Sequence, residues 1–176
     1  HSNGTIFFTD PPYGIINPKR VEGFPGKMMY GGCNVFKYDP KTKSLEAIVV
    51  DMERPNGIAF SLDESQLFIS NTGDIKYIRR YEIDKNLKIS KPIEFAKSDP
   101  EHVFDGFRFD EDNNLWTSCG KGVACFDASG EQIGYIKIPE LVSNVDFGGS
   151  EGKKLFITAS TSFYMVDLNI KGAKFK

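Results

Sequence analysis

Asn56 and Asp105 have the side chains and the spacing expected of ligands to a divalent cation. Each is followed by glycine, and each lies four residues before a phenylalanine, Phe60 or Phe109. Carboxylate and amide oxygens are hard donors that suit Ca²⁺ or Mg²⁺ and are acceptable to Zn²⁺ or Mn²⁺. Asn-Gly and Asp-Gly pairs also form the turns that enter strands, and spacing alone favours that simpler role.

The sequence does not favour covalent catalysis at such a site. It has no Ser-His-Asp or Cys-His pattern, and its two histidines, His1 and His102, are poorly placed for one. His102 lies three residues before Asp105 and could carry protons, although a position in a surface loop is the commoner use. Covalent catalysis by a side chain is therefore not expected.

A repeated pattern positions Asn56 and Asp105. In each copy a polar residue opens a strand, phenylalanine follows four positions later, a turn comes next, and an apolar strand ends in Ser or Thr. The copies cover residues 56–70, 104–118 and 143–158, and residues 3–9 carry the second half of the pattern. Ser143 occupies the position of Asn56 and Asp105 in the third copy, where a turn residue is the commoner interpretation.

The repeat predicts an all-β protein. The aromatic residues of the second strand are Phe7, Phe68, Trp116 and Phe156, which follow one another at 61, 48 and 40 residues. Each is followed by a third strand that ends in Asp, a turn, and a fourth strand, the last of these expected from Ala173 to Lys176. Four short strands in each unit of roughly 40–45 residues are typical of a β-propeller. We expect about four blades, the first lacking its inner strand, and almost no helix.

Several residues near the ends of the predicted strands could contact a substrate. Asp10 and Asn71 follow the second strand of their units, and Tyr13 belongs to a loop of residues 11–34 that could cover a pocket or be a plain insertion. Arg108 alternates toward the side of Gly106, so it could meet an anionic substrate or form a salt bridge to a neighbouring acidic turn. We treat these four as candidate substrate contacts.

Composition excludes two classes of partner. The 176 residues are 40% hydrophobic and 26% charged with a net charge of −2, which is ordinary for a globular protein. Lys and Arg are scattered among Asp and Glu, so neither nucleic acid nor an anionic membrane is an expected partner. No apolar run approaches the roughly 20 residues of a membrane-spanning helix. The compartment cannot be inferred.

With the repeat laid out, the sequence resembles the carboxy-terminal portion of the SMP-30/gluconolactonase/LRE family of six-bladed propellers, particularly bacterial gluconolactonases. The resemblance covers essentially the whole chain. It rests on five segments in order: residues 4–14 (GTIFFTDPPYG), 54–61 (RPNGIAFS), 105–110 (DGFRFD), 147–149 (FGG) and 155–162 (LFITASTS).

The resemblance implies a metal-dependent hydrolase that opens a sugar lactone. Family members hold one divalent cation through a Glu, two Asn and an Asp, and the resemblance places one Asn at Asn56 and the Asp at Asp105. It implies Ca²⁺ before Zn²⁺, Mg²⁺ or Mn²⁺, with Asp105 as general base and Asn56 as a ligand that positions the ion. The Glu and the other Asn would lie upstream of His1.

The resemblance also implies that residues 1–176 are part of a single propeller domain. A six-bladed ring needs on the order of 100 further amino-terminal residues, so we expect the missing blades to be supplied as a partner segment or chain. Other functions remain open at this point. They are a phosphotriesterase-like or strictosidine-synthase-like propeller enzyme, or a non-enzymatic propeller that binds calcium or a partner protein.

Overall fold

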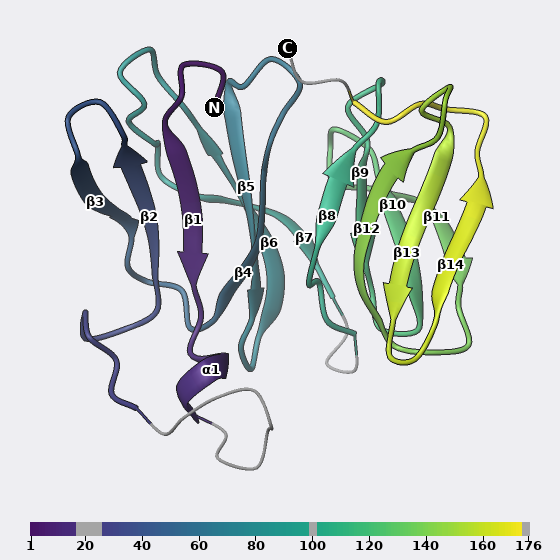
Figure 1. Ribbon diagram of the computed structural model, residues 1–176, viewed down its shortest axis with the longest axis horizontal. Coiled ribbons are helices and arrows are strands. Elements are labelled where there is room, and N and C mark those ends of the chain that lie inside the picture. The colour runs from purple at the N-terminus through teal and green to yellow at the C-terminus, as the bar shows by residue number, and fades with distance from the viewer. Residues whose placement is uncertain (17–25, 99–101, 174–176) are drawn as a thin grey trace.

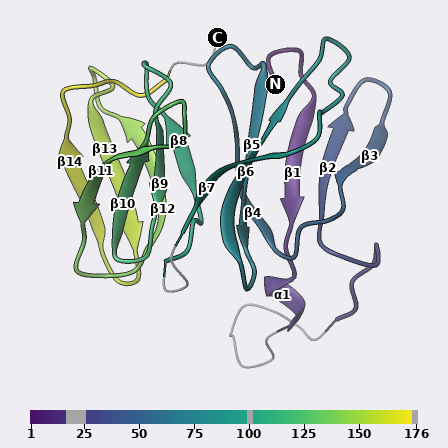
Figure 2. The same ribbon diagram turned by 180° about the vertical axis from the view of Figure 1, so that it is seen from behind.

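Four antiparallel sheets follow one another across the molecule in sequence order (Figures 1 and 2). The computed structural model describes residues 1–16, 26–98 and 102–173. Sheet 1 contains β1 (Ile6–Asp10), β2 (Asn34–Asp39) and β3 (Ser44–Val49), and sheet 2 contains β4 (Pro55–Phe60), β5 (Gln66–Thr72), β6 (Lys76–Glu82) and β7 (Ile93–Lys97). Sheet 3 contains β8 (Phe107–Phe109), β9 (Leu115–Ser118), β10 (Gly122–Phe126) and β11 (Gln132–Lys137), and sheet 4 contains β12 (Val142–Gly148), β13 (Lys154–Ala159) and β14 (Phe163–Asp167).

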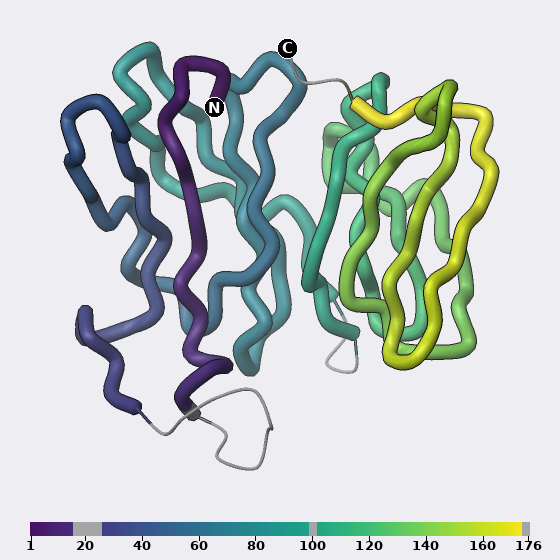
Figure 3. The backbone as a smooth tube through the Cα atoms, viewed as in Figure 1, coloured from purple at the N-terminus to yellow at the C-terminus, as the bar shows by residue number. Residues whose placement is uncertain are grey.

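Every strand pairs with its neighbour in sequence, so each sheet is an up-and-down meander, whose path the backbone trace shows (Figure 3). This confirms the all-β class and the four-stranded pattern of the two central sheets. The expected near-absence of helix holds for the described residues, whose single helix is the four-residue α1 (Tyr13–Ile16) below the end of β1 (Figure 1). None of the described helical residues forms a segment long and apolar enough to cross a bilayer.

The strand expected from Ala173 to Lys176 falls largely on residues 174–176, which lie outside the described residues. Ala173 donates its N–H to the Phe109 carbonyl at 2.9 Å, and Asp110 forms a bridge with Gly172. The described end of the chain therefore returns to sheet 3 rather than pairing beside β14.

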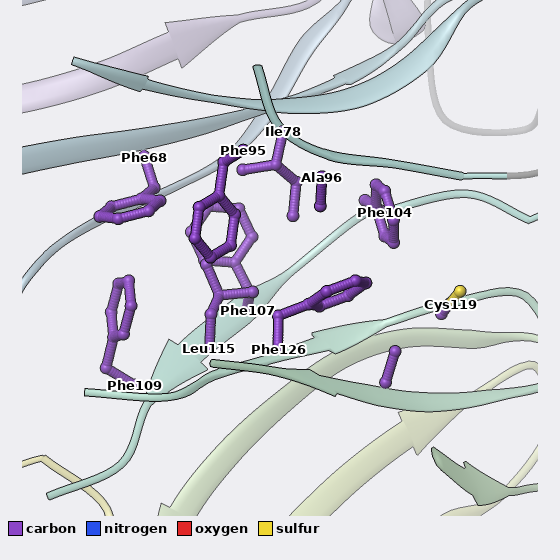
Figure 4. Close-up of a cluster of buried hydrophobic side chains, with 11 residues drawn as sticks. Phe68, Ile78, Phe95, Ala96, Phe104, Phe107, Phe109, Leu115, Cys119 and Phe126 are labelled. Carbon is purple, nitrogen blue, oxygen red and sulfur yellow. The ribbon is translucent and has the colours of Figure 1, made fainter. Parts of the chain in front are cut away.

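Three apolar cores lie between successive sheets. The core between sheets 2 and 3 is rich in phenylalanine, and its buried rings include Phe68, Phe95, Phe104, Phe107 and Phe109 (Figure 4). Full burial of one such ring contributes about 1.5–3 kcal/mol. Of the repeated aromatics, Phe7, Phe68 and Trp116 contact the cores, whereas Phe156 stacks on Phe163 at a ring distance of 5.6 Å on the outer face of sheet 4.

Three of the Asp residues that close third strands, Asp39, Asp84 and Asp127, form the turns predicted for them. A carboxylate oxygen of Asp39 accepts the Lys41 N–H at 2.8 Å, and Asp84 and Asp127 accept the N–H two residues on at 2.8 and 2.9 Å. Hydrogen bonds hold the pKa of the three carboxyls below the usual range, chiefly from the Lys41 N–H to Asp39, the Lys88 N–H to Asp84 and the Ser129 hydroxyl to Asp127. Each turn connects the third strand of its unit to the fourth.

The first strands of sheets 2, 3 and 4, which we call the inner strands, lie side by side, with β8 between β4 and β12. The pairing of β4 with β5 and of β12 with β13 is irregular at one end. The register of β4 shifts between Pro55 and Ile58, and that of β12 shifts between Val142 and Asn144. Irregular pairing of this kind commonly re-aims side chains beside a functional site.

Candidate functional site

Asn56 and Asp105 come together where β4 pairs irregularly with β5 and where the chain enters β8. Asn56 lies in the register shift of β4, and Asp105 lies two residues before β8. Their side chains share a hydrogen bond. Burial raises the pKa of the Asp105 carboxyl, and the hydrogen bond with Asn56 opposes that shift. The repeat therefore brings the two predicted ligands into contact.

Glycines let the three inner strands approach closely at this point. A Cβ on Gly57 would lie 2.1 Å from the Asp105 carbonyl oxygen, and a Cβ on Gly106 would lie 2.0 Å from Asn144 Oδ1. Gly106 also donates its N–H to the Ser143 carbonyl at 3.1 Å. Gly57 is thus required by the Asp105 backbone, whereas at Gly106 the close neighbour is the Asn144 side chain, which can move.

The geometry suits part of a cation site. Taking a carboxylate even partly out of water is costly unless a charge or several hydrogen bonds compensate it, and in the described residues only Asn56 lowers the pKa of the partly buried Asp105. An ionised Asp105 beside an amide oxygen offers two hard donors, while Ca²⁺ takes six to eight oxygen ligands. The described residues hold no group of three or more His, Cys, Asp or Glu side chains that could form a complete metal site.

Two of the candidate substrate contacts bind other parts of the protein. The Tyr13 hydroxyl hydrogen-bonds with the Thr72 hydroxyl, which ties α1 to the end of β5. The Asn71 side chain is buried, accepts the Arg54 N–H at 2.8 Å and donates to the Ile75 carbonyl at 2.7 Å. The oxygen and the nitrogen of the Asn71 side-chain amide therefore both hydrogen-bond to backbone, so the geometry of Asn71 suits a structural role.

Asp10 and Arg108 lie in two different hollows. Asp10 lines a hollow of about 190 Å³ together with Pro12, Met28 and Cys33. Arg108 lines an open hollow of about 420 Å³ beside Phe60, and its Nε lies 3.3 Å from an Asp146 carboxylate oxygen on β12. Arg108 therefore faces the surface of the inner strands and forms an ion pair, although its partner is a residue of the neighbouring strand β12 rather than of an acidic turn. A role for Asp10 or Arg108 on substrate stays a prediction.

Ser143 and His102, the two further candidates, contact a neighbouring strand and a turn. The Ser143 hydroxyl lies 2.9 Å from the Thr158 hydroxyl, across the sheet. The His102 ring packs against Gly120, where an added Cβ would lie 2.4 Å from its Cδ2.

Sequence reasoning missed the groups that surround this pair. Ser70 and Ser118 are fully buried and hydrogen-bond to backbone atoms of Gly57 and Asp105, and the Asn144 side chain lies over Gly106. The signal for the hydroxyls was present, because Ser or Thr follows the repeated aromatic by two residues in every copy. Asn144 is adjacent to Ser143, the residue that the repeat singles out.

Comparison with known proteins decides the family. Residues 1–161 match the SMP-30/Gluconolactonase/LRE-like region. The chain belongs to this family. The gluconolactonase of Zymomonas mobilis is 34% identical over 168 residues, which are 90% of this chain and 46% of that protein. The chain thus spans about half the length of this relative.

Solved structures agree with the fold. A gluconolactonase from Xanthomonas campestris superposes with a TM-score of 0.86 at 33% identity, covering 96% of this chain and 55% of its own. The calcium-binding protein regucalcin from Agrobacterium tumefaciens superposes with a TM-score of 0.70 at 18% identity, covering 82% of this chain and 55% of its own. The second likeness supports the fold alone.

Proposed function

We propose that this chain forms part of a metal-dependent lactonase, in which Asn56 and Asp105 are ligands of one divalent cation. The observation that carries the proposal is the contact between a partly buried carboxylate and an amide at the ends of neighbouring inner strands. The kinship with gluconolactonases supports a lactone as substrate. Ca²⁺ is the cation of choice, because carboxylate and amide oxygens are hard donors that suit it.

The proposed reaction is hydrolysis of a cyclic ester. The oxygen of a water molecule bonds to the carbonyl carbon, the bond from that carbon to the ring oxygen breaks, and a hydroxy acid results. A bound divalent cation would polarise the carbonyl and lower the pKa of the water. A carboxylate oxygen of Asp105 accepts the proton that the water loses and returns it to the departing ring oxygen. Asn56 orients the carboxylate through their shared hydrogen bond.

Substitution of Asn56 tests the site directly. In the intact protein, Asn56→Ala removes one oxygen donor and the hydrogen bond to Asp105. We therefore expect a larger loss of cation affinity than of stability. Calorimetric titration with Ca²⁺ measures that affinity, and urea unfolding of the metal-free protein measures stability. Affinity equal to that of the parent would show that Asn56 is a turn residue only.

The outer faces of sheets 1 and 4 expose apolar side chains. On sheet 1, Phe8 stacks on Phe36 at a ring distance of 5.3 Å and is 39% exposed, and on sheet 4 Phe163 and Met165 are 66% and 50% exposed. Exposed apolar faces on strands favour association. We propose that both faces pack against further sheets of the same protein, supplied as a preceding segment or a separate chain, which complete the propeller.

This proposal predicts the behaviour of the isolated 176 residues. Alone they should self-associate, and they should disperse only beside a polypeptide that covers the two faces. Light scattering after size exclusion, with intact-mass measurement of each peak, checks this. A stable, dispersed monomer of 19.7 kDa would contradict it.

A further inference from the structure

Four hydroxyl side chains occupy one repeated position, two residues after the repeated aromatic. They are Thr9, Ser70, Ser118 and Thr158. In the two central sheets the residues are Ser70 and Ser118, and neither has any exposed surface. A buried hydroxyl requires hydrogen-bond partners, and those of Ser70 and Ser118 belong to the segments that carry Asn56 and Asp105.

Ser70 connects the backbones of the two predicted ligands. Its Oγ accepts the Gly57 N–H at 2.7 Å and donates to the Asp105 carbonyl at 3.2 Å. Gly57 lies in the register shift of β4, between the paired residues Pro55 and Ile58. The hydroxyl thus serves as the hydrogen-bond acceptor for the N–H of that irregular segment while it bridges to the neighbouring sheet.

Two further hydroxyls hold the same segments. The Asp105 N–H donates to Ser118 Oγ at 2.8 Å, so both backbone polar atoms of Asp105 are bound by buried serines from two different sheets. Thr9 Oγ1 donates to the Asn56 carbonyl at 2.7 Å from sheet 1. Thr9 and Ser70 follow the same pattern. In each case the hydroxyl of one sheet donates to the backbone carbonyl of the predicted ligand in the next sheet.

We infer that Ser70 is a positioning residue for the cation site, and that its hydroxyl sets the separation between Asn56 and Asp105. Thr9 assists by fixing the Asn56 carbonyl. The inference rests on the proposed function, because it assumes that the two side chains bind one cation. Groups that orient metal ligands typically change metal affinity by 10- to 100-fold when they are removed.

The test compares Ser70→Ala with Ser61→Ala in the intact protein. Ser61 is also buried and makes two hydrogen bonds, with the Gln66 N–H at 3.0 Å and with Asp63 Oδ1 at 2.7 Å, but it follows β4 at the end away from Asn56. Calorimetry measures Ca²⁺ affinity, and urea unfolding measures the stability of the metal-free protein. We expect both variants to lose stability and only Ser70→Ala to lose affinity, by about 10-fold or more.

Variants that retain the hydroxyl should restore the Ca²⁺ affinity that is lost when the hydroxyl is removed. Ser70→Thr should keep the affinity of the parent, because threonine occupies the same repeated position at Thr9 and Thr158. Thr9→Val keeps the shape of the side chain and removes the donor, whereas Thr9→Ser keeps the donor. Thr9 is only half-buried, so both Thr9 variants should fold. If Ser70→Ala does not fold, the two Thr9 variants test whether the hydroxyls position the ligands. We expect weaker Ca²⁺ binding for Thr9→Val alone.

The outcomes separate this inference from the proposed function. If Asn56→Ala weakens Ca²⁺ binding while Ser70→Ala and Thr9→Val stay within two-fold of the parent, positioning by the hydroxyls is wrong and the cation site stands. If the parent binds no Ca²⁺, the proposed calcium site and the inference fail together.

Discussion

Replacement of Asp105 by Asn is expected to lower lactone hydrolysis by about 10²–10⁴-fold, the usual contribution of a general base. The amide can still offer an oxygen to a cation, but it cannot accept the proton from water. Initial rates on a panel of sugar lactones, measured on the intact protein with saturating Ca²⁺, test this. Activity within a few-fold of the parent would remove Asp105 from the role of base.

The metal-free form of the same variant shows whether the fold is intact, and it should be more stable than the parent. Burial raises the pKa of Asp105 above its ordinary 3.8 in the folded protein. A folded-state pKa above the unfolded value means that stability declines as pH rises from about 4 through the folded pKa. The variant lacks this decline, so its urea midpoint at pH 7 should exceed that of the parent. An equal or lower midpoint would indicate that burial of the carboxylate is not a cost.

Replacement of Gly57 by Ala is expected to disrupt the site as strongly as replacement of Asp105 by Asn. Its Cβ would lie 2.1 Å from the Asp105 carbonyl oxygen and 2.8 Å from two ring carbons of Phe107, so β4 and the segment entering β8 must separate. Overpacking of this kind costs about 1–3 kcal/mol. A displacement of about 1 Å at a reacting group can cost 10²-fold in rate. We expect a lower urea midpoint and weak Ca²⁺ binding.

Gly134→Ala is the matched control for this prediction. Gly134 lies in β11, and a Cβ there would meet only Cys125 Cβ at 3.6 Å, an ordinary contact. The control should therefore retain cation affinity. Equal behaviour of the two variants would show that the close approach at Gly57 does not matter for the site.

The repeat made most of the fold predictable. Strand order follows chain order, and Asp39, Asp84 and Asp127 form their turns from local sequence alone. The contact between Asn56 and Asp105 was also accessible, because equal spacing before Phe60 and Phe109 places both residues at equivalent ends of neighbouring inner strands.

The remainder depends on contacts between segments that are distant in sequence, which spacing does not report. Whether Asn71 faces a pocket or the protein interior depends on the Arg54 backbone 17 residues away. The return of Ala173 to the Phe109 carbonyl also joins two segments that are distant in sequence. The bridge made by Ser70 follows from a register shift in β4 that alternation of apolar residues does not reveal.

The three cores between successive sheets have a consequence for local opening of the molecule. In this chain sheets 1 and 4 are each held by one core, whereas sheets 2 and 3 are each packed on both sides. Opening free energies differ between regions according to how much packing each must lose, so amide protons of the end sheets should exchange with solvent first. Asn56 and Asp105 belong to the two central sheets. Transient fraying of sheet 1 therefore breaks the Thr9 hydrogen bond to Asn56 but leaves the Ser70 bridge between the two ligand positions in place.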